Sequence, residues 1–458
     1  MKVIICGAGQ VGSNIAAYLS QEDNDVSVVD TNHQLINEIN DHLNVSGYVG
    51  NAAHPDVLEQ AGANDAEMII AATYADEVNM VACQVAHSIF RIPKKIARVR
   101  QQVYLNPSWA NMFSRDHMPI DLIISPEVEV SNAIIRRLNA AGVFNLIHFA
   151  EGKISFASVI CAEDSPIVNT PLKHLTPIFP ELSIEIVAIL RGGEKIIPKA
   201  EDILLPGDEV YFVCDSAHLK RCLEAFGKHV SSTRRAIIIG GGNIGLLLAK
   251  KIEEKYPDID LRLIERNLQR AHYVSQQLKK TLVLHGDGLN RQIMEEASSE
   301  STEVVITVMD SDEANILSSI LAKNYGTQRS ITLINNTNFV PLVSSMGVDA
   351  IVSPRSITVS SILQHVRKGR ILSAHSLRDG FAEVMEIEAL ETSSVINIPL
   401  RDLKKPENTI IGAIYRDDEV IIPRPDTVIR PHDRVIILAE HTRVREVEHL
   451  FAVRPEYF

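Results

Sequence analysis

One glycine-rich turn occurs twice in this chain, and each copy lies between an apolar strand-like run and a helical pattern. The first copy is Gly7-Ala8-Gly9-Gln10-Val11-Gly12, and the second is Gly240-Gly241-Gly242-Asn243-Ile244-Gly245. An acidic residue follows each copy at the end of the next strand-like run, Asp30 in the first and Glu265 in the second. Because this context is typical of dinucleotide-binding turns, the sequence predicts two Rossmann-like domains.

The chemistry of such a turn rests on the backbone. Its three glycines permit a tight bend, a close approach to a pyrophosphate and close packing of helix on strand. The following helix presents free N–H groups and the positive end of its dipole to phosphates. Asp30 or Glu265 can accept hydrogen bonds from a ribose and would repel a 2′-phosphate, which favours NAD or an adenine nucleotide over NADP. Arg266 weakens that preference in the second copy, and a vacant turn that only caps its helix is the alternative for either copy.

The similarity between the two halves extends well beyond the glycines. Gly50-Asn51 matches Gly286-Asp287, and a β-rich unit that closes on a helix follows each glycine-rich half. We therefore expect an α/β protein with two Rossmann-like doubly wound parallel-sheet domains, each followed by a small α+β domain. The expected domains span residues 1–145, 146–228, 233–370 and 371–458, with linkers near 228–234 and 368–378.

Composition excludes several classes of protein. The formal net charge of −13 over 458 residues argues against binding to nucleic acid, which depends on clustered Lys and Arg. No uncharged apolar run approaches the roughly 18 residues of a membrane-spanning helix, and the chain starts with a strand-like run rather than a signal peptide. We therefore expect a cytoplasmic protein. The five cysteines form no CxxC pair and are expected to be reduced thiols in the core.

Further candidate residues lie at the ends of predicted strands. Arg98 and Arg100 are two residues apart on one predicted strand, where their side chains would share a face and could reach terminal phosphates. Surface arginines are the equally acceptable interpretation. Thr73 would lie at the carboxyl edge of the sheet, where ligands of such sheets bind, although a helix cap is the more ordinary role.

The chain offers neither metal ligands nor catalytic groups in a recognisable pattern. The segments Asp76-Glu77-Val78-Asn79 and Asp312-Glu313-Ala314-Asn315 fall at predicted helix starts and are interpreted as caps rather than metal ligands. An NAD-dependent oxidoreductase with a duplicated cofactor domain is the alternative function. It needs a proton donor or acceptor facing the cofactor, and neither small domain concentrates such residues. We therefore expect a protein that is not an enzyme.

These motifs, in this order, resemble the TrkA family, the cytosolic regulatory subunits of bacterial Trk potassium uptake systems. The resemblance rests on the first glycine turn, Asp30, Gly50-Asn51, the Asp76 to Asn79 segment, the strand with Arg98 and Arg100, and the duplicated small domains with Leu205-Pro206-Gly207-Asp208. It covers essentially the whole chain. It implies RCK (regulator of potassium conductance) domains, regulation by NAD, NADH, ATP and ADP, and a homotetrameric ring. It also implies association with a TrkH- or TrkG-type membrane subunit at the cytoplasmic face of the inner membrane.

The resemblance also implies roles for individual residues. In the first copy the turn would hold phosphates, Asp30 the ribose, Asn51 and Thr73 the adenosine or its linkage, and Arg98 and Arg100 the distal phosphates. The second copy has Leu333 and Asn335 in place of the two arginines, and Pro431-His432-Asp433 in place of Pro206-Gly207-Asp208. The expected cofactor-binding residues are Gly7, Ala8, Gly9, Gln10, Val11, Gly12, Asp30, Asn51, Thr73, Arg98 and Arg100, and in the second copy Gly240, Gly242, Asn243, Ile244, Gly245, Glu265 and Asp287.

Overall fold

The computed structural model describes residues 1–21, 24–138, 143–178, 182–227, 233–297, 301–366, 371–377 and 381–452. Residues 228–232 of the first expected linker lie outside these ranges. The second expected linker, 368–378, was predicted wrongly, because residues 371–377 pair as a strand of the following sheet. The chain forms two compact units, one made of Met1–Ser131 with Ser353–His365, the other of Asn132–Val352 with Val366–Phe458. Each contains a glycine turn on a parallel sheet.

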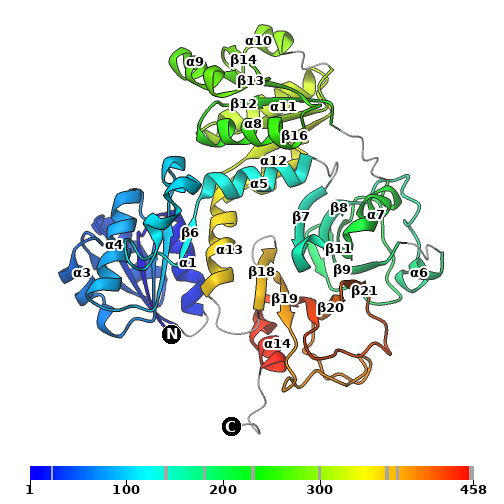
Figure 1. Ribbon diagram of the computed structural model, residues 1–458. Coiled ribbons are helices and arrows are strands. Elements are labelled where there is room, and N and C mark those ends of the chain that lie inside the picture. The colour runs from blue at the N-terminus through cyan, green and yellow to red at the C-terminus, as the bar shows by residue number, and fades with distance from the viewer. Residues whose placement is uncertain are drawn as a thin grey trace. The chain divides into compact units, whose positions relative to one another are not determined.

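The first parallel sheet has six strands in the order β3-β2-β1-β4-β5-β6, and helices cover both of its faces (Figure 1). This is the doubly wound order: β1 to β3 follow one another toward one side of the sheet, and β4 to β6 toward the other side. Proteins with this fold bind their ligands where the order reverses, beside β1. Its short strands are apolar because both faces are buried. The strands are β1 (Lys2–Cys6), β2 (Asp25–Asp30), β3 (Ser46–Val49), β4 (Met68–Ala71), β5 (Lys94–Arg98) and β6 (Leu122–Ile124), and the helices are α1 (Gln10–Gln21), α2 (His33–His42), α3 (Pro55–Gln60), α4 (Asp76–Ser88) and α5 (Pro126–Leu138).

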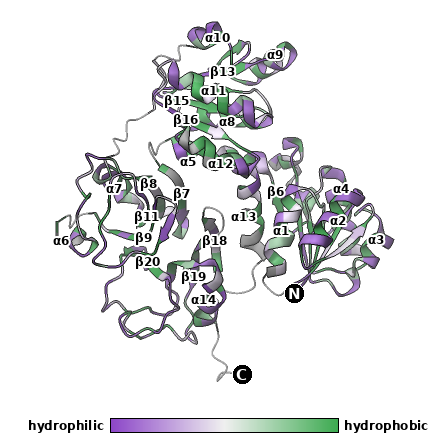
Figure 2. Cartoon of the chain, turned by 180° about the vertical axis from the view of Figure 1, so that it is seen from behind, coloured by the Kyte–Doolittle hydropathy of each residue, from purple (hydrophilic) through white to green (hydrophobic). Residues whose placement is uncertain are grey.

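The second parallel sheet repeats this arrangement with the order β14-β13-β12-β15-β16-β17. Its strands are β12 (Arg235–Ile239), β13 (Asp260–Glu265), β14 (Leu282–His285), β15 (Val304–Thr307), β16 (Arg329–Leu333) and β17 (Ala350–Val352). Its helices are α8 (Asn243–Lys255), α9 (Leu268–Gln277), α10 (Arg291–Glu296), α11 (Asp312–Asn324), α12 (Val340–Ser345) and α13 (Pro354–Val366). Hydropathy colouring shows that the strands are mainly apolar, while polar residues gather on helices and loops (Figure 2).

The helix after each sixth strand packs away from its own sheet. Residues 353–365, which include most of α13, belong to the first unit, where Arg355 donates a hydrogen bond to Asn14 of α1. The second half of α5 belongs to the second unit, where Lys251 of α8 donates to Asn132 over 2.7 Å. Arg329 of β16 also donates to the carbonyl of Arg137 at the end of α5, over 3.1 Å. Sequence periodicity alone did not predict this exchange.

The two small domains are five-stranded antiparallel sheets with the orders β10-β9-β11-β8-β7 and β18-β19-β22-β20-β21. The first consists of β7 (Val143–Phe149), β8 (Ile154–Ile160), β9 (Ile184–Arg191), β10 (Glu194–Ile196), β11 (Glu209–Asp215), α6 (Leu175–Ile178) and α7 (Leu219–Ala225). The second consists of β18 (Ile371–Leu377), β19 (Ala382–Glu388), β20 (Thr409–Arg416), β21 (Glu419–Ile421), β22 (Arg434–Glu440) and α14 (Val444–Phe451). Two parallel and two antiparallel sheets confirm the predicted fold class.

The two antiparallel sheets share one core. Phe156 and Tyr211 of the first sheet pack in the same buried cluster as Val384 and Leu438 of the second. The opposite face of each sheet packs on its own helix, with Phe226 beside α7 in one core and Phe451 of α14 in the other. Each sheet is therefore buried on both sides, which accounts for its apolar strands.

The same ion pair closes the turn before the last long strand of each small domain. Arg191 donates to both carboxylate oxygens of Asp208, over 2.8 and 2.7 Å, and Arg416 does the same to Asp433, over 2.8 and 2.6 Å. His432 adopts a φ of 68°, close to the 86° of Gly207, so both turns have the same left-handed bend. The two Pro-x-Asp segments are thus structural in both copies.

All five cysteines are buried in the core, as predicted, and none of them forms a disulfide with another described residue. Among the described residues, no helix has both the length and the apolar character needed to cross a membrane.

Candidate functional site

The carboxyl edge of the first parallel sheet gathers the residues predicted from the first glycine turn. The turn follows β1, Asp30 ends β2, Asn51 follows β3, Thr73 follows β4, and Arg98 ends β5. Because parallel strands end at one edge of a sheet, five loops meet where the strand order reverses. The residues that the sequence assigned to one site therefore lie at the same edge of the first sheet.

The first and third glycines of the turn are required by the protein's own packing. Gly7 has a φ of 110°, in the left-handed region that favours glycine, and a Cβ there would lie 3.0 Å from the Ala72 carbonyl oxygen. A Cβ on Gly12 would lie 1.8 Å from the Gly7 carbonyl oxygen. Gly9 differs, because a Cβ on it would meet nothing within 4 Å. The missing side chain at Gly9 therefore leaves open space, which is where a pyrophosphate would approach the backbone.

Asp30 joins the glycine turn to β2. Its Oδ2 accepts a hydrogen bond from the Ala8 backbone N–H over 2.6 Å, and its Oδ1 accepts one from Asn32 over 2.8 Å. A carboxylate has about four acceptor positions, so these two bonds leave capacity for ribose hydroxyls. Helix α1 begins at Gln10, and its first N–H groups lack acceptors within the helix. Donors for phosphate and an acceptor for ribose thus lie side by side.

Asn51 shapes the loop after β3. Its Oδ1 accepts a hydrogen bond from the Ala53 N–H over 2.9 Å, and the preceding Gly50 N–H donates to the Asp30 carbonyl over 2.9 Å. These bonds hold the loop beside the end of β2. Within the described residues the Asn51 Nδ2 group donates no side-chain hydrogen bond, so it is the donor by which the predicted contact with an adenosine would be made.

Asn79 is the residue whose role sequence reasoning missed. It is fully buried, and its Oδ1 accepts hydrogen bonds from the Thr73 N–H over 2.8 Å and the Thr73 hydroxyl over 2.7 Å. Its Nδ2 donates to the carbonyl of Arg98 over 2.9 Å. Asn79 therefore fixes the ends of β4 and β5 relative to each other. A repeated Asn in both halves of the chain was the available signal.

The interpretation of Asp76 as a helix cap is wrong. The N-cap of α4 is Ala75, whose side chain makes no capping bond, and the Asp76 carboxylate accepts from the backbone N–H groups of Arg100 and Gln101 over 2.8 to 3.0 Å. Asp76 thus fixes the loop that follows β5. Within the described ranges no group of three or more His, Cys, Asp or Glu side chains is arranged to hold a metal ion.

Arg98 and Arg100 differ more than their spacing predicted. Strand β5 ends at Arg98, so Arg100 lies in the following loop, where its Nε donates to Glu127 over 3.2 Å and its guanidinium lies 5.3 Å from the ring centroid of Tyr74. The Nε of Arg98 is buried and has no hydrogen-bond partner in the described part of the chain. Burial, and then the charge of Arg100, lower the pKa of Arg98.

An unpartnered buried guanidinium N–H costs free energy, and an anionic oxygen is the acceptor that suits it best. Arg98 lies at the same sheet edge as the open space at Gly9. The residues present therefore fit a ligand with a pyrophosphate or a longer phosphate chain.

The second copy repeats the backbone of this site closely. Gly240 has the same φ of 110°, and a Cβ on Gly245 would lie 1.9 Å from the Gly240 carbonyl oxygen. Glu265 accepts from the Gly241 N–H over 2.7 Å, as Asp30 does from Ala8. Asp287 accepts from the Leu289 N–H over 2.9 Å, in the same kind of turn as Asn51. Gly242 again has open space around the Cβ position, and Asn243 and Ile244 begin α8.

The cations of the second copy are placed differently. Leu333 and Asn335 replace the two distal arginines, and Asn335 bonds to Asp312 instead of facing a ligand. Arg270 of α9 donates from Nε to the Gly241 carbonyl over 2.7 Å and from Nη2 to Asn243 over 3.3 Å. The second turn thus has a guanidinium against its backbone and against the start of α8, a feature that the sequence pattern did not reveal.

Comparison with known proteins agrees with the duplicated layout. Residues 3–126 and 236–354 match the TrkA-N domain, and residues 156–227 and 384–452 match the TrkA-C domain. A Trk system potassium uptake protein TrkA from Azorhizobium caulinodans is 46% identical over 458 residues, covering 100% of both chains. The chain belongs to the TrkA family. Its TrkA relatives include one from Vibrio alginolyticus, 39% identical over 99% of each chain, and TrkA homolog 1 of Methanosarcina mazei, 33% identical over 98% of this chain and 100% of that one.

Solved structures extend the TrkA comparison to the fold. The GsuK RCK domain gives a TM-score of 0.60 at 17% identity and covers 99% of this chain and 95% of its own. The GsuK channel bound to NAD gives 0.58 at 16% identity, covering 98% and 78%. The TrkA family relatives are named as potassium uptake proteins and not as enzymes, in agreement with the missing catalytic groups.

Proposed function

We propose that this TrkA family member is a cytosolic regulatory subunit of a potassium uptake system, which binds NAD(H) and adenine nucleotides and gates a membrane ion-conducting subunit. The observation that carries the proposal is the buried, unpartnered Nε of Arg98 at the same sheet edge as the open glycine turn. A site of this kind binds phosphates without supplying catalytic groups. A regulatory ligand is therefore a better fit than a consumed cofactor.

The nucleotide would bind across the carboxyl edge of the first sheet. The glycine turn and the start of α1 would hold the phosphates nearest the adenosine, while Asp30 would accept from the ribose hydroxyls. Asn51 and Thr73 would lie beside the adenosine or its linkage. The GsuK channel, which has the same fold, is described as bound to NAD, which supports a dinucleotide as one ligand.

Nucleotide discrimination would depend on Arg98 and Arg100. ATP carries one more phosphate than ADP, and the additional charge would bind guanidinium groups at the end of β5. We expect the Arg98→Gln/Arg100→Gln double variant to lose the difference between ATP and ADP in their effects on ion flux. Arg424→Gln, an exposed arginine of the second small domain, is the matched control for loss of charge. A difference that persists in the double variant contradicts this role.

The second site would have a weaker or different preference. It retains Glu265 and the open space at Gly242 but lacks distal arginines, so a dinucleotide fits it better than a triphosphate. Arg270 and Arg266 supply positive charge near the ribose, which would reduce the rejection of a 2′-phosphate. Comparing NAD and NADP affinities in Asp30→Ala and Glu265→Ala chains separates the two sites.

Coupling to the membrane subunit requires a nucleotide that binds two arrangements of the protein with different free energies. A coupling free energy of about 1 to 3 kcal/mol is typical and would change flux several-fold or more. We propose that the chains assemble as a homotetrameric ring on a TrkH- or TrkG-type partner at the inner membrane. Support for self-association comes from apolar side chains exposed at matching positions, Val81 of α4 and Leu317 of α11.

The decisive experiment combines partner and ligand. The protein would be copurified with the potassium-transport subunit of its own system, and ion flux would be measured with ATP, ADP and NADH. We expect flux to depend on which nucleotide is present. Asp30→Ala should weaken NAD binding in calorimetry, whereas Asp25→Ala, an exposed aspartate at the other end of β2, should not. Equal affinity in both variants would place the ribose elsewhere.

A further inference from the structure

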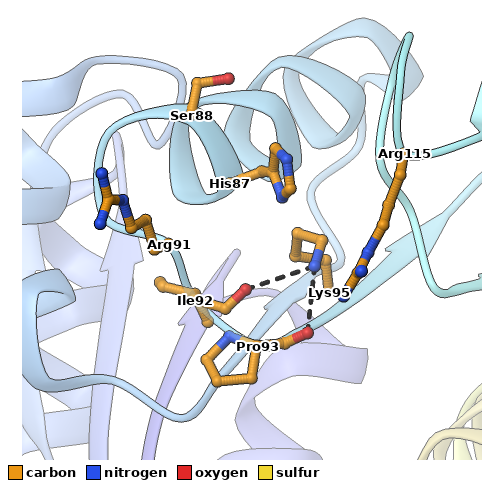
Figure 3. Close-up of a pocket in the computed structure, with 7 residues that line it drawn as sticks. All are labelled: His87, Ser88, Arg91, Ile92, Pro93, Lys95 and Arg115. Carbon is orange, nitrogen blue, oxygen red and sulfur yellow. Dashed lines mark hydrogen bonds between the residues drawn. The ribbon is translucent and has the colours of Figure 1, made fainter.

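A second pocket lies at the opposite edge of the first parallel sheet from the glycine turn. It has a volume of about 560 Å³ and is formed by the end of α4, the connection to β5 and the segment before β6 (Figure 3). Its lining residues are His87, Ser88, Arg91, Ile92, Pro93, Lys95 and Arg115. Four of the seven are basic, and a volume in this range is typical of small-molecule sites.

Lys95 forms the inner wall of the pocket. Its side chain is only 3% exposed, and Nζ donates to the carbonyls of Ile92 and Pro93 (Figure 3). The same Nζ lies 2.8 Å from the Asp121 carboxylate. Asp121 therefore balances the charge of Lys95. The Asp121 carboxylate also accepts from the Lys95 backbone N–H over 2.7 Å, which fixes both residues at the start of β5.

The other basic side chains have no such balance. Within the part of the chain that the structure describes, Arg91 and Arg115 make no side-chain hydrogen bond or ion pair. The His87 side chain makes none there either. Figure 3 shows Arg115 extending toward Lys95 from one side, the His87 ring above Lys95, and Arg91 on the other side. The pocket thus has two guanidinium charges that no described carboxylate offsets.

The corresponding region of the second parallel sheet has different residues at the matching positions. Position 87 corresponds to Lys323 of α11, whose Nζ donates to Asp349 over 2.7 Å and to the Gly347 carbonyl over 2.8 Å. Position 95 corresponds to Ser330, whose hydroxyl bonds to the same Asp349 over 3.2 Å. The lysine that pairs with the aspartate has moved from the helix to the strand in the first sheet. As a consequence, the helix position facing the pocket carries His87.

The backbone at Arg91 is a further difference. Arg91 has a φ of 56°, in the left-handed region, directly before Ile92, whose N–H donates back to the Ala86 carbonyl over 3.0 Å. The corresponding residue after α11 is Gly326, with a φ of 104°. Glycine is the usual residue at this position because a side chain there is strained. An arginine with this backbone conformation lowers the stability of the protein, and strained backbone of this kind is typical of functional sites.

We propose that this pocket binds a small diphosphate anion. Arg91 and Arg115 supply two forked donors on different sides, each suited to a phosphate group, while the inner wall at Lys95 is already neutralised by Asp121. Three replacements relative to the second sheet, at positions 87, 91 and 95, all fall on this one pocket. The site is separate from the nucleotide site and does not depend on the proposed function.

Inorganic pyrophosphate is the probe, measured by calorimetry on the full chain. The measurement uses the Arg98→Gln/Arg100→Gln background, so that arginines of the nucleotide site do not contribute. In that background we expect pyrophosphate binding that becomes at least about tenfold weaker after Arg91→Gly or Arg115→Gln, the effect of losing one charged hydrogen-bond donor. Orthophosphate should bind more weakly than pyrophosphate.

Arg91→Gly separates binding from folding. Glycine relieves the strained backbone, so this variant should melt at the same temperature as the parent or higher while it loses affinity for pyrophosphate. Arg424→Gln should change neither property. The proposal would be overturned if the background chain did not bind pyrophosphate, or if the Arg91→Gly and Arg115→Gln variants bound it as tightly as the background chain does.

Discussion

The side-chain amide of Asn79 donates a hydrogen bond to the backbone carbonyl of Arg98 over 2.9 Å. The same side chain accepts from Thr73 at the end of the neighbouring strand. Asn315 makes the matching bonds in the second sheet, to Met309 over 2.8 Å and to the Leu333 carbonyl over 3.1 Å. One buried amide in each half thus fixes the ends of two neighbouring strands at the carboxyl edge of its sheet.

Asn79→Ala should lower stability and nucleotide affinity together. The change leaves buried backbone groups of Thr73 and Arg98 without partners, at a cost of about 1 to 3 kcal/mol for each group. Asn315→Ala is the matched control, with a similar loss of stability expected from urea unfolding but no change in ATP affinity at the first site. Unaltered calorimetric affinity in Asn79→Ala would show that the position of Arg98 does not matter for binding.

The two glycines Gly9 and Gly12 should respond oppositely to alanine. A Cβ at Gly9 meets only open space, so the free energy of unfolding should change by less than about 0.5 kcal/mol while nucleotide binding is lost to steric exclusion. A Cβ at Gly12 would lie 1.8 Å from a carbonyl oxygen, so Gly12→Ala should destabilise by about 1 to 3 kcal/mol or more. Urea unfolding and calorimetry on both variants check this. Tight nucleotide binding by Gly9→Ala would be evidence against the turn as the phosphate site.

The duplicated ion pairs of the small domains should contribute to stability and not to ligand binding. Asp208 and Asp433 are each 1% exposed, while Arg191 is 35% exposed and Arg416 17% exposed. Replacing either aspartate by Asn leaves buried donors with poorer acceptors and should cost about 1 to 3 kcal/mol. The loss should be larger for Asp433→Asn because its arginine is less hydrated. Thermal melting measures both, and nucleotide affinity should stay at the parental value.

His375 should make the sandwich of small domains sensitive to acid. Burial, and then the charge of Arg136, lower the pKa of His375 from 6.5 to about 4, and its ring lies edge-on to Phe149 at 5.6 Å. A histidine with a lowered folded-state pKa gives stability that is present above pH 6.5 and is lost as the pH falls toward 4. The melting temperature should therefore fall less on acidification in His375→Gln than in the parent. His33→Gln, an exposed histidine of α2, is the control, and parallel curves for parent and His375→Gln would contradict the assignment.

Local sequence patterns predicted much of the architecture. The glycine turns, Asp30 and Glu265 lie where the motif requires them, because a tight turn between strand and helix depends on residues that are adjacent in the sequence. The short apolar strands and buried cysteines followed from the same local reasoning. The repeat also showed the order of the four domains, because duplicated segments keep their spacing.

The prediction failed where a side chain acts on a distant segment. Asp76 was interpreted as a cap of its own helix, but its carboxylate binds the loop after β5. Arg100 was placed on a strand that ends at Arg98. Arg270 gave no signal at all, since its contact with Gly241 joins residues 29 positions apart.

The sequence by itself therefore determined that this chain carries two nucleotide-type turns on parallel sheets, each followed by a β-rich domain, without catalytic groups. Those properties depend on backbone conformation and local periodicity, which adjacent residues specify. Only the tertiary structure decided which charges have partners. Among the described residues, it buried the Nε of Arg98 without an acceptor, paired Lys95 with Asp121, and gave Arg91 and Arg115 no ion-pair partner. Pairing and burial arise when distant segments pack together, so no single segment of the sequence encodes them.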